Sequence, residues 1–380
     1  PDNSITGIVT DPPYGIRFMN EKWDYDIPNI DVWNECYRVM KPGAHLLSLS
    51  SARTYHRMCC KIEDAGFEIR DMIVWMYSTG FPKGVNIGKK VDKLLGNERK
   101  LVGYKNPHYD GGKRKHSSAP QFTELMGGKR KEYETIDGMI PIYEGNSDWE
   151  GWGSLLKPCL EPIVMARKPL SEKSITKNCL RWGTGGINVK SCSIKTDNNL
   201  LKIQNTDTPK FSGIYNKGKE YRIPIGTVSG GQLGGRYPSN MIHDGSEEVM
   251  SLFPSTKMWS ASRVFYCAKP SSKEKNLGCD ELDEKISGRY NFRLSGNLDC
   301  NIPKDKNFHP TIKPIALMEY LIKLISRKGD VIIDPFAGSG TTLVSAIKLG
   351  VICIGIEREP EYVDIAKRRL LYAEKNYNGN

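Results

Sequence analysis

The chain has 380 residues, of which 26% are charged, and a formal net charge of +11 at neutral pH. A chain of this length can bury a sizeable core and hold one large domain or two ordinary ones. We find no apolar run long enough to cross a bilayer and no signal peptide, so we expect no membrane contact. The excess of basic residues favours a polyanionic partner such as nucleic acid, although a merely basic protein would show the same charge.

The ten cysteines form no recognisable framework. They include no C-x-x-C pair, and no histidine lies at a zinc-finger spacing from two of them. We therefore expect free thiols in a reducing cytoplasm and no metal site.

Strands and helices alternate over the first 77 residues. The apolar pattern predicts strands at 5–10, 44–49 and 67–77, with helices at 30–40 and 55–65 between them. Lys41-Pro42-Gly43 is expected to end the first helix. Alternation at this pace predicts a parallel sheet with right-handed crossovers.

The alternation stops between residues 78 and 153. This stretch is rich in Gly, Lys, Arg and Tyr, and only residues 86–95 have a convincing helical pattern. Basic residues mixed with Tyr and Gly are typical of a surface that follows a nucleic-acid strand, but a solvated flexible insert would look the same. Both interpretations stay open. Strand character returns at 161–166.

The second half of the chain begins with an irregular segment. From about 169 to 307 the periodicity is short and β-like, which we interpret as an inserted module with its own small core. A helix at 315–325, a strand from 331, a helix at 341–349, a strand at 351–356 and a helix from 361 follow. We therefore expect one α/β domain formed by 1–168 and 308–380, with inserts at about 78–153 and at 169–307.

A glycine-rich segment follows the strand at 331. It reads Asp334-Pro335-Phe336-Ala337-Gly338-Ser339-Gly340-Thr341-Thr342. Its glycines allow the backbone to approach a ligand closely, and the following helix offers free amides and a positive dipole end. Glu357 ends the next strand, where a carboxylate can accept hydrogen bonds from ribose hydroxyls. Position 343 is Leu, so the third glycine of a dinucleotide pattern is absent, and we expect a smaller nucleotide-like cofactor.

The segment Asp11-Pro12-Pro13-Tyr14-Gly15 follows the first strand. Two prolines stiffen the backbone and remove two amide donors, so the flanking side chains are displayed rigidly. The Asp11 carboxylate can accept both hydrogens of an exocyclic amine, and stacking of the Tyr14 ring on a base is worth ~1–3 kcal/mol. An ordinary strand-to-loop turn is the alternative. With the glycine-rich segment, the pattern predicts a group-transfer enzyme that acts on a base.

These two segments resemble the amino-methyltransferases of DNA that use S-adenosylmethionine. His309-Pro310-Thr311-Ile312-Lys313-Pro314 is similar to the segment that precedes the cofactor strand in that family, and Gly80-Phe81-Pro82-Lys83 and Gly183-Thr184-Gly185 are similar to prokaryotic and phage members. The order of the motifs is that of the permuted β class. The resemblance implies a Rossmann-like α/β fold, with a mostly parallel sheet, helices on both faces and a target-recognition region near 170–305.

The resemblance also implies roles for individual residues. Asp11 and Tyr14 would hold the target amine and its ring, and the carbonyl of Pro12, followed by Pro13, would accept from the amine. The cofactor would be surrounded by Asp334, Pro335, Phe336, Gly338, Gly340 and Thr341, with Glu357 on its ribose and with Thr311 and Lys313 over its methionine end. Because position 11 is Asp and not Ser, the implied acceptor is the N6 amine of adenine.

The implied function is site-specific methylation of adenine N6 in DNA, in the cytoplasm of a prokaryotic cell or a phage-infected host. S-adenosylmethionine would be the cofactor, DNA the substrate and a cognate restriction endonuclease a partner. Methylation of cytosine N4, of RNA or of protein amides stays open, as does a DNA-binding protein with a decayed methylase fold; a nicotinamide-dinucleotide oxidoreductase is a more distant alternative. Neither the recognition sequence nor the oligomeric state can be predicted.

The start of the chain gives one further expectation. The chain begins at Pro1 without a methionine, and we interpret it as a fragment. In enzymes with this motif order, a strand with a short acidic motif precedes the first strand seen here. We therefore expect the fragment to bind the cofactor weakly.

Overall fold

The computed structural model describes most of the chain. The described residues are 1–18, 21–78, 80, 84–105, 109–110, 113–114, 140–194, 202–203, 209–211, 220–222, 228–229, 237–251, 255–256, 259–260, 265–286 and 304–377. Gly80 is thus described, but residues 81–83 of that motif and most of residues 106–139 lie outside these ranges. Within them, no helix has the length and apolar character that a membrane crossing requires.

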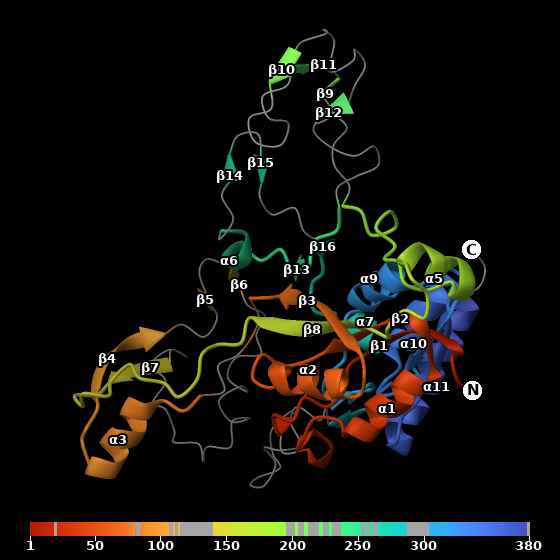
Figure 1. The fold of residues 1–380 in the computed structure, drawn as a ribbon. Coiled ribbons are helices and arrows are strands. Elements are labelled where there is room, and N and C mark those ends of the chain that lie inside the picture. The colour runs from red at the N-terminus through yellow and green to blue at the C-terminus, as the bar shows by residue number, and fades with distance from the viewer. Residues whose placement is uncertain are drawn as a thin grey trace.

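Eight strands form one central sheet (Figure 1). In spatial order they are β16 (Phe265–Tyr266), β13 (Met241–His243), β3 (Glu68–Met76), β8 (Leu160–Arg167), β2 (Met40–Leu49), β1 (Ile5–Thr10), β19 (Val331–Asp334) and β20 (Ile352–Gly355). Neighbouring strands run parallel, except that β8 is antiparallel to both β2 and β3. The prediction of a mostly parallel sheet is therefore confirmed, but β2 begins at Met40 and includes the Lys41-Pro42-Gly43 turn.

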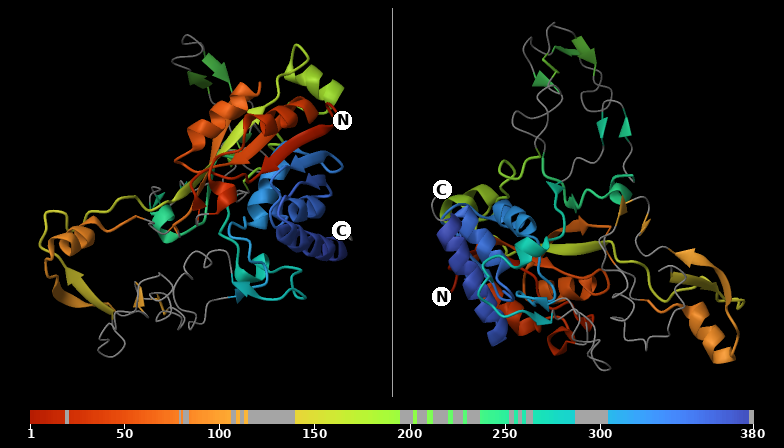
Figure 2. Two further views of the ribbon diagram at one scale, coloured as in Figure 1. Left: turned by 90° about the horizontal axis from the view of Figure 1, so that it is seen from below. Right: turned by 180° about the vertical axis from the view of Figure 1, so that it is seen from behind.

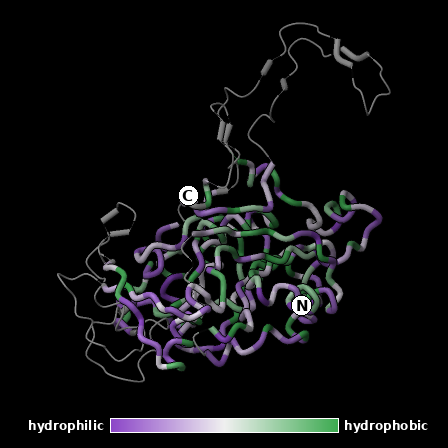
Figure 3. The backbone as a smooth tube through the Cα atoms, turned by 90° about the vertical axis from the view of Figure 1, so that its left-hand side faces the viewer, coloured by the Kyte–Doolittle hydropathy of each residue, from purple (hydrophilic) through white to green (hydrophobic). Residues whose placement is uncertain are grey.

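The sheet is covered on both faces, as the resemblance implied. One face packs against α1 (Ile30–Val39) and α2 (Tyr55–Asp64), and the other against α9 (Ile315–Ile325). Successive strand residues alternate between the two cores: Ile8 belongs to the first and Val9 to the second, and both are fully buried. Apolar segments accordingly run through the middle of the body in Figure 3.

Helix ends follow local sequence signals. Asn29 caps α1 by accepting a hydrogen bond from the amide of Ile30, and Pro314 precedes α9. The remaining helices near the sheet are α5 (Ile175–Trp182), α10 (Thr341–Leu349) and α11 (Pro360–Tyr377), with short α6 (Glu247–Met250), α7 (Ser272–Lys275) and the 3-10 turn η2 (Lys22–Asp24). The helices predicted at 30–40, 55–65, 315–325, 341–349 and from 361 are confirmed within one or two residues at each end.

An arm stands away from the sheet between β3 and β8 (Figures 1 and 2). It consists of α3 (Ile87–Leu95) and the antiparallel pair β4 (Lys100–Lys105) and β7 (Ile140–Glu144). Arg99 ties it together by pairing with Asp92 and Glu150. The helix predicted at 86–95 is confirmed, with Asn86 as its cap, whereas the two strands of the arm were not predicted.

Several two-stranded pairs lie outside the central sheet. They are β5 (Tyr109–Asp110) with β6 (Lys113–Arg114), β9 (Lys202–Ile203) with β12 (Val228–Ser229), β10 (Pro209–Phe211) with β11 (Glu220–Arg222), β14 (Ser255–Thr256) with β15 (Trp259–Ser260) and β17 (Lys285–Ile286) with β18 (Lys304–Asp305).

The segment 169–307 is not a separate module throughout. β13 and β16 lie within it and extend the central sheet beyond β3, with Ile242 beside Trp75 and Phe265 beside Ile242. Ile242 is fully buried in the core that also contains α9. The interpretation of this segment as an insert with its own core is therefore wrong for these strands. The exact domain boundaries stay predictions.

Candidate active site

Most of the residues singled out from the sequence meet at one edge of the sheet, where the carboxyl ends of the parallel strands lie. Asp11 follows β1, Asp334 ends β19 and Glu357 follows β20. β1 and β19 are neighbours, with Gly7 beside Ile332 and Ile8 beside Ile333, so the two motifs come together although they are more than three hundred residues apart in sequence. We call this the carboxyl edge. Ligands of open α/β sheets bind at such an edge.

A cluster of ionisable side chains surrounds Asp11. Its Oδ1 accepts a hydrogen bond from the Tyr14 hydroxyl at 2.7 Å, and its Oδ2 lies 2.5 Å from the Lys313 ammonium. Glu161 Oε2 lies 3.1 Å from the same hydroxyl and 3.5 Å from the same ammonium. The Tyr77 hydroxyl donates to Glu161 Oε1 at 3.2 Å. We refer to Asp11, Tyr14, Tyr77, Glu161 and Lys313 as the base-site network.

Glu161 reaches this network because β8 runs against its neighbours. The amino end of an antiparallel strand lies beside the carboxyl ends of the strands it pairs with. Glu161 is accordingly opposite Trp75, near the end of β3, while Tyr77 directly follows that strand. The side chains of Asp11, Lys313 and Glu161 are 16%, 9% and 19% exposed, so their charges interact through little water.

Burial and mutual contact shift the pKa values of the network. Burial raises the pKa of Asp11, with Glu161 adding to the rise, and these effects outweigh the opposing ammonium of Lys313. Burial alone would lower the pKa of Lys313, but the carboxylates of Asp11 and Glu161 outweigh burial and raise it. Burial and both carboxylates raise the pKa of Tyr14 well above its usual value. Lys313 therefore stays charged and Tyr14 stays neutral at physiological pH.

A third carboxylate, that of Asp24, holds the turn that carries Tyr14. Asp24 is buried and accepts hydrogen bonds from four backbone amides, at positions 14, 15, 16 and 18, at 2.6–3.3 Å. Gly15 has φ +65°, and an added Cβ would lie 2.8 Å from the Ile27 amide nitrogen, so only glycine suits this turn. The Thr54 hydroxyl donates to the Tyr14 carbonyl at 2.7 Å. Together these contacts fix the position of the Tyr14 ring.

Asp334 makes a different kind of contact. Its Oδ1 accepts from the Thr10 hydroxyl at 2.7 Å and from the Phe336 amide at 3.1 Å, and its Oδ2 accepts from the Thr342 hydroxyl at 2.6 Å. The side chain is almost fully buried. Burial raises the pKa of Asp334 to about 6 despite these hydrogen bonds. Asp334 thus ties β1, its own turn and α10 together.

The glycine-rich turn is closely packed, so its two glycines cannot be replaced without a shift of their neighbours. Gly338 has φ +51°, and a Cβ there would lie 2.8 Å from His309 Nε2, while Gly340 has φ +79° and directly precedes α10. The Gly338 amide donates to Glu357 Oε2 at 2.8 Å. Glu357 Oε1 accepts from the amides of Arg358 and Glu359, so the carboxylate uses three of its roughly four acceptor positions. The remaining acceptor capacity is what a ribose hydroxyl requires, and the residues present suit the expected cofactor.

The other predicted cofactor residues lie around this turn. The Thr341 hydroxyl accepts from Arg369, a fully buried guanidinium of α11 that also donates to the Ser339 carbonyl at 2.7 Å. The Thr311 amide donates to His309 Nδ1 at 3.4 Å. Burial lowers the pKa of His309 to about 3. Lys313 was expected at the methionine end of the cofactor, but here its ammonium pairs with Asp11.

Sequence reasoning missed several residues of the site. Glu161, Tyr77 and Asp24 belong to the base-site network or support it, and His309 and Arg369 support the glycine-rich turn. The only available signal for Glu161 was its place at the start of a strand, and that signal is uninformative until the direction of the strand is known.

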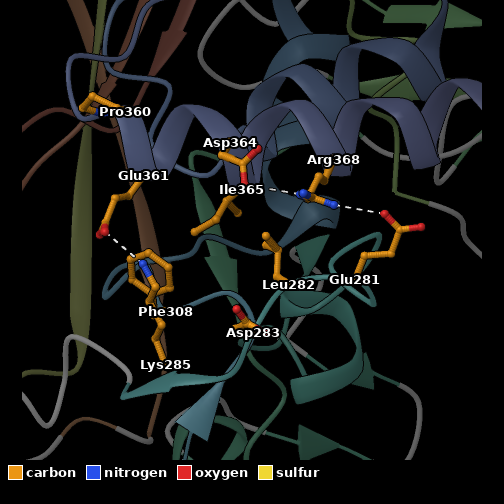
Figure 4. Close-up of a pocket in the computed structure, with 10 residues that line it drawn as sticks. All are labelled: Glu281, Leu282, Asp283, Lys285, Phe308, Pro360, Glu361, Asp364, Ile365 and Arg368. Atoms are coloured by element: carbon orange, nitrogen blue, oxygen red, sulfur yellow. Dashed lines mark hydrogen bonds and ion pairs between the residues drawn. The ribbon is translucent and has the colours of Figure 1, made fainter.

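A separate groove of about 470 Å³ lies between the start of α11 and the segments at 281–285 and 308 (Figure 4). Five of its six charged side chains form ion pairs: Lys285 with Glu361 at 2.9 Å, and Arg368 with Asp364 and Glu281. None of the catalytic or cofactor-binding residues predicted from the sequence lines this groove. No group of three or more potential metal ligands occurs in the described parts of the chain.

Comparison with known families agrees with this geometry. A family described as DNA methylase, of the N6 and N4 type, matches residues 5–124 and 165–368, which is most of the chain. The chain belongs to this family. The two matched ranges contain Asp11, Asp334 and Glu357. They leave out residues 125–164, which include strand β7 of the arm and Glu161.

Individual relatives match over shorter stretches. The Type II methyltransferase M2.DpnII of Streptococcus pneumoniae is 39% identical over 113 residues, which are 26% of this chain and 42% of that protein. The Type II methyltransferase M2.LlaDCHI of Lactococcus lactis subsp. cremoris is 38% identical over 113 residues, with the same coverage. The chain thus matches 42% of the length of these curated relatives. The M1.HpyAVI–SAM complex, a solved structure, covers 97% of this chain and 89% of its own at 16% identity, with a TM-score of 0.40.

Membership of the DNA methylase family confirms the predicted fold class, together with the mostly parallel sheet and its two covered faces. S-adenosylmethionine is the methyl donor of this family, as the resemblance implied. The roles of the individual site residues stay predictions.

Proposed function

We propose that this chain transfers a methyl group from S-adenosylmethionine to the N6 amine of an adenine in DNA. The observation that carries the proposal is the base-site network at the carboxyl edge, beside the glycine-rich turn. Asp11 and Tyr14 come from one stiff turn after β1, and Thr10, which ends that strand, bonds to Asp334 of the turn at 2.7 Å. A target amine held at Asp11 and a cofactor held at the turn would therefore be neighbours.

Each residue has a physical task in this reaction. Bound S-adenosylmethionine supplies a methyl group made electrophilic by its sulfonium. The amine of a base is a poor nucleophile because its lone pair is delocalised into the ring. A hydrogen bond from that amine to the Asp11 carboxylate favours tetrahedral nitrogen and stabilises the positive charge that develops there. The Tyr14 ring, held by the turn on Asp24, would stack on the base, which has to leave the duplex to reach this site.

The cofactor would be held by the turn and its surroundings. Gly338 allows close approach of its backbone, Glu357 has acceptor capacity for a ribose hydroxyl, and Phe336 and Thr311 lie on neighbouring segments. Asp at position 11 supports adenine, because the resemblance associates cytosine N4 acceptors with Ser. The net charge of +11 suits a DNA substrate, and a cognate endonuclease stays a prediction.

Nucleoside mass spectrometry on DNA from methylase-free cells that express this chain tests the proposal. We expect N6-methyladenine to appear, and sequencing of the modified sites would give the recognition sequence. Appearance of N4-methylcytosine instead would keep the methyltransferase and reject adenine as the acceptor. Cells that express Asp11→Asn provide the matched control, and methylation by that variant at the wild-type level would contradict the assigned site.

A further inference from the structure

The proposed function leaves one proton to be placed. A neutral amine that gains a methyl group becomes positively charged, and it returns to neutrality by giving up one proton. Asp11 would be the carboxylate in contact with that amine, so it would receive the proton. A protonated Asp11 can no longer stabilise positive charge, and it must lose the proton before the site can work again.

The side-chain oxygens of Asp11, Tyr14 and Glu161 form a continuous hydrogen-bonded line. The Tyr14 hydroxyl oxygen lies 2.7 Å from Asp11 Oδ1 and 3.1 Å from Glu161 Oε2. Tyr14 has a single hydroxyl hydrogen, so it donates to only one of the two carboxylates at any moment. When it donates to Glu161, its oxygen is free to accept a hydrogen bond from a protonated Asp11.

We propose that Glu161 receives, through the hydroxyl of Tyr14, the proton that the target amine gives to Asp11. The proton on Asp11 Oδ1 moves to the Tyr14 oxygen while the hydroxyl hydrogen of Tyr14 moves to Glu161 Oε2. Asp11 becomes a carboxylate again, Tyr14 remains neutral and Glu161 becomes a carboxylic acid. Only O–H bonds form and break in this step, and no further reactant is needed. The inference rests on the proposed function.

The position of the Lys313 ammonium favours this direction. The Lys313 ammonium lies 2.5 Å from Asp11 Oδ2 but 3.5 Å from Glu161 Oε2, so it stabilises negative charge on Asp11 more strongly. The raised pKa of Tyr14 keeps the hydroxyl protonated between transfers. The other titratable groups that face Asp11 or Glu161 in the described residues are Asp334, which is close enough to Asp11 for its own pKa to rise, and Tyr77.

If Glu161 has a purely structural role, replacing it with glutamine should have little effect on the methyl-transfer rate; if it accepts a proton, the replacement should slow the reaction. Glu161 also holds the Tyr14 hydroxyl in place, and the amide oxygen of a glutamine could do the same. Unlike a carboxylate, an amide oxygen does not take up a proton at neutral pH. Glu161→Gln therefore separates the two roles, and Glu63→Gln, on the exposed face of α2, is a matched control for the loss of a carboxylate.

The experiment measures steady-state methyl transfer, over many turnovers, to unmethylated genomic DNA from a methylase-free strain, with S-adenosylmethionine saturating. We expect Glu161→Gln to slow the transfer by about 100-fold, while cofactor affinity stays within about twofold and Glu63→Gln has the wild-type rate. Tyr14→Phe keeps the ring and breaks the line of oxygens, so adding Glu161→Gln to it should cost nothing more. Loss of the Glu161 charge should also lower the pKa of Asp11 and shift the acid limb of the rate profile to lower pH.

Several results would overturn the inference. One is a Glu161→Gln variant that transfers methyl groups at the wild-type rate. Another is a Glu161→Gln substitution that slows the reaction by the same factor in the Tyr14→Phe variant as in the wild-type chain. Should Glu161→Gln fail to fold, the wild-type rate in mixtures of light and heavy water decides: transfer of two protons predicts a curved dependence on the deuterium fraction, and a flat or linear one overturns the inference. A wild-type chain that methylates no DNA overturns the proposed function itself, and the inference with it.

Discussion

Two aspartates that look alike in the sequence have different surroundings in the structure. Asp11 and Asp334 both end or follow a buried strand, both precede a proline, and their strands are neighbours in the sheet. The Asp334 carboxylate is almost fully buried, and hydroxyls and an amide occupy both of its oxygens. Asp11 instead meets an ammonium, a phenol and, through them, a second carboxylate. The same local sequence thus builds the framework in one place and presents a reactive group in the other.

The strongest test of this contrast is Asp11→Ala. Loss of the carboxylate that stabilises charge on the amine should lower the methyl-transfer rate by about 10²–10³-fold. The affinity for S-adenosylmethionine should stay within a few-fold, because the glycine-rich turn does not contact Asp11 directly. Single-turnover kinetics and calorimetric titration measure the two quantities. A variant that methylates normally would remove Asp11 from the reaction.

Asp334→Asn should leave most of the methyl-transfer rate and change the pH dependence of stability instead. The folded-state pKa of Asp334, about 6, lies above its ordinary value of 3.8, so the folded protein binds this proton more tightly. The stability that the protonated group contributes is therefore present at low pH and is lost as the pH rises through 6. This loss amounts to about 2 kcal/mol between about pH 4.5 and pH 7.

Asparagine carries no charge at either pH, so the variant should gain about 2 kcal/mol relative to wild type over that interval. Urea unfolding of both proteins at the two pH values measures the difference. A difference that does not change with pH would mean that Asp334 titrates normally in the folded protein.

Glu357→Ala should have the smallest effect of the three and act on the cofactor alone. Loss of an acceptor for a ribose hydroxyl, and of the carboxylate that holds the Gly338 amide, should weaken S-adenosylmethionine binding by about tenfold. The rate at saturating cofactor should change little, in contrast to Asp11→Ala. Glu361→Ala, an exposed carboxylate on α11, is the matched control. Equal affinities in the two variants would place the ribose elsewhere.

The sequence was informative where the signal is local. Apolar spacing predicted the helices of the central domain and the strands β1, β2, β3 and β8, because elements of this length repeat their burial pattern several times. The four-residue strands β19 and β20 were predicted from their short apolar runs. The residues Asp11, Asp334 and Glu357, which end or follow their strands, could be placed at one edge, since parallel strands share the direction of their carboxyl ends.

The rest of the site depends on contacts that no local pattern encodes. Glu161 joins the network only because β8 is antiparallel, and the pattern of a buried strand is the same in both directions. Asp24 accepts hydrogen bonds from backbone amides, and because every residue except proline carries such an amide, the sequence does not show which ones it contacts. β13 and β16 have three and two residues, too few to show a period, and they were therefore assigned to an insert although they extend the sheet.

The antiparallel direction of β8 also bears on how this chain could vary. The chain leaves the sheet after Met76 and returns at Leu160. The Tyr77 amide donates a hydrogen bond to the Cys159 carbonyl at 2.8 Å, at the base of this excursion. Because eight residue pairs between β3 and β8 fix these two ends, the length and sequence of what lies between them are not constrained by the sheet. Evolution or an engineer can therefore exchange this segment while the base-site network is preserved.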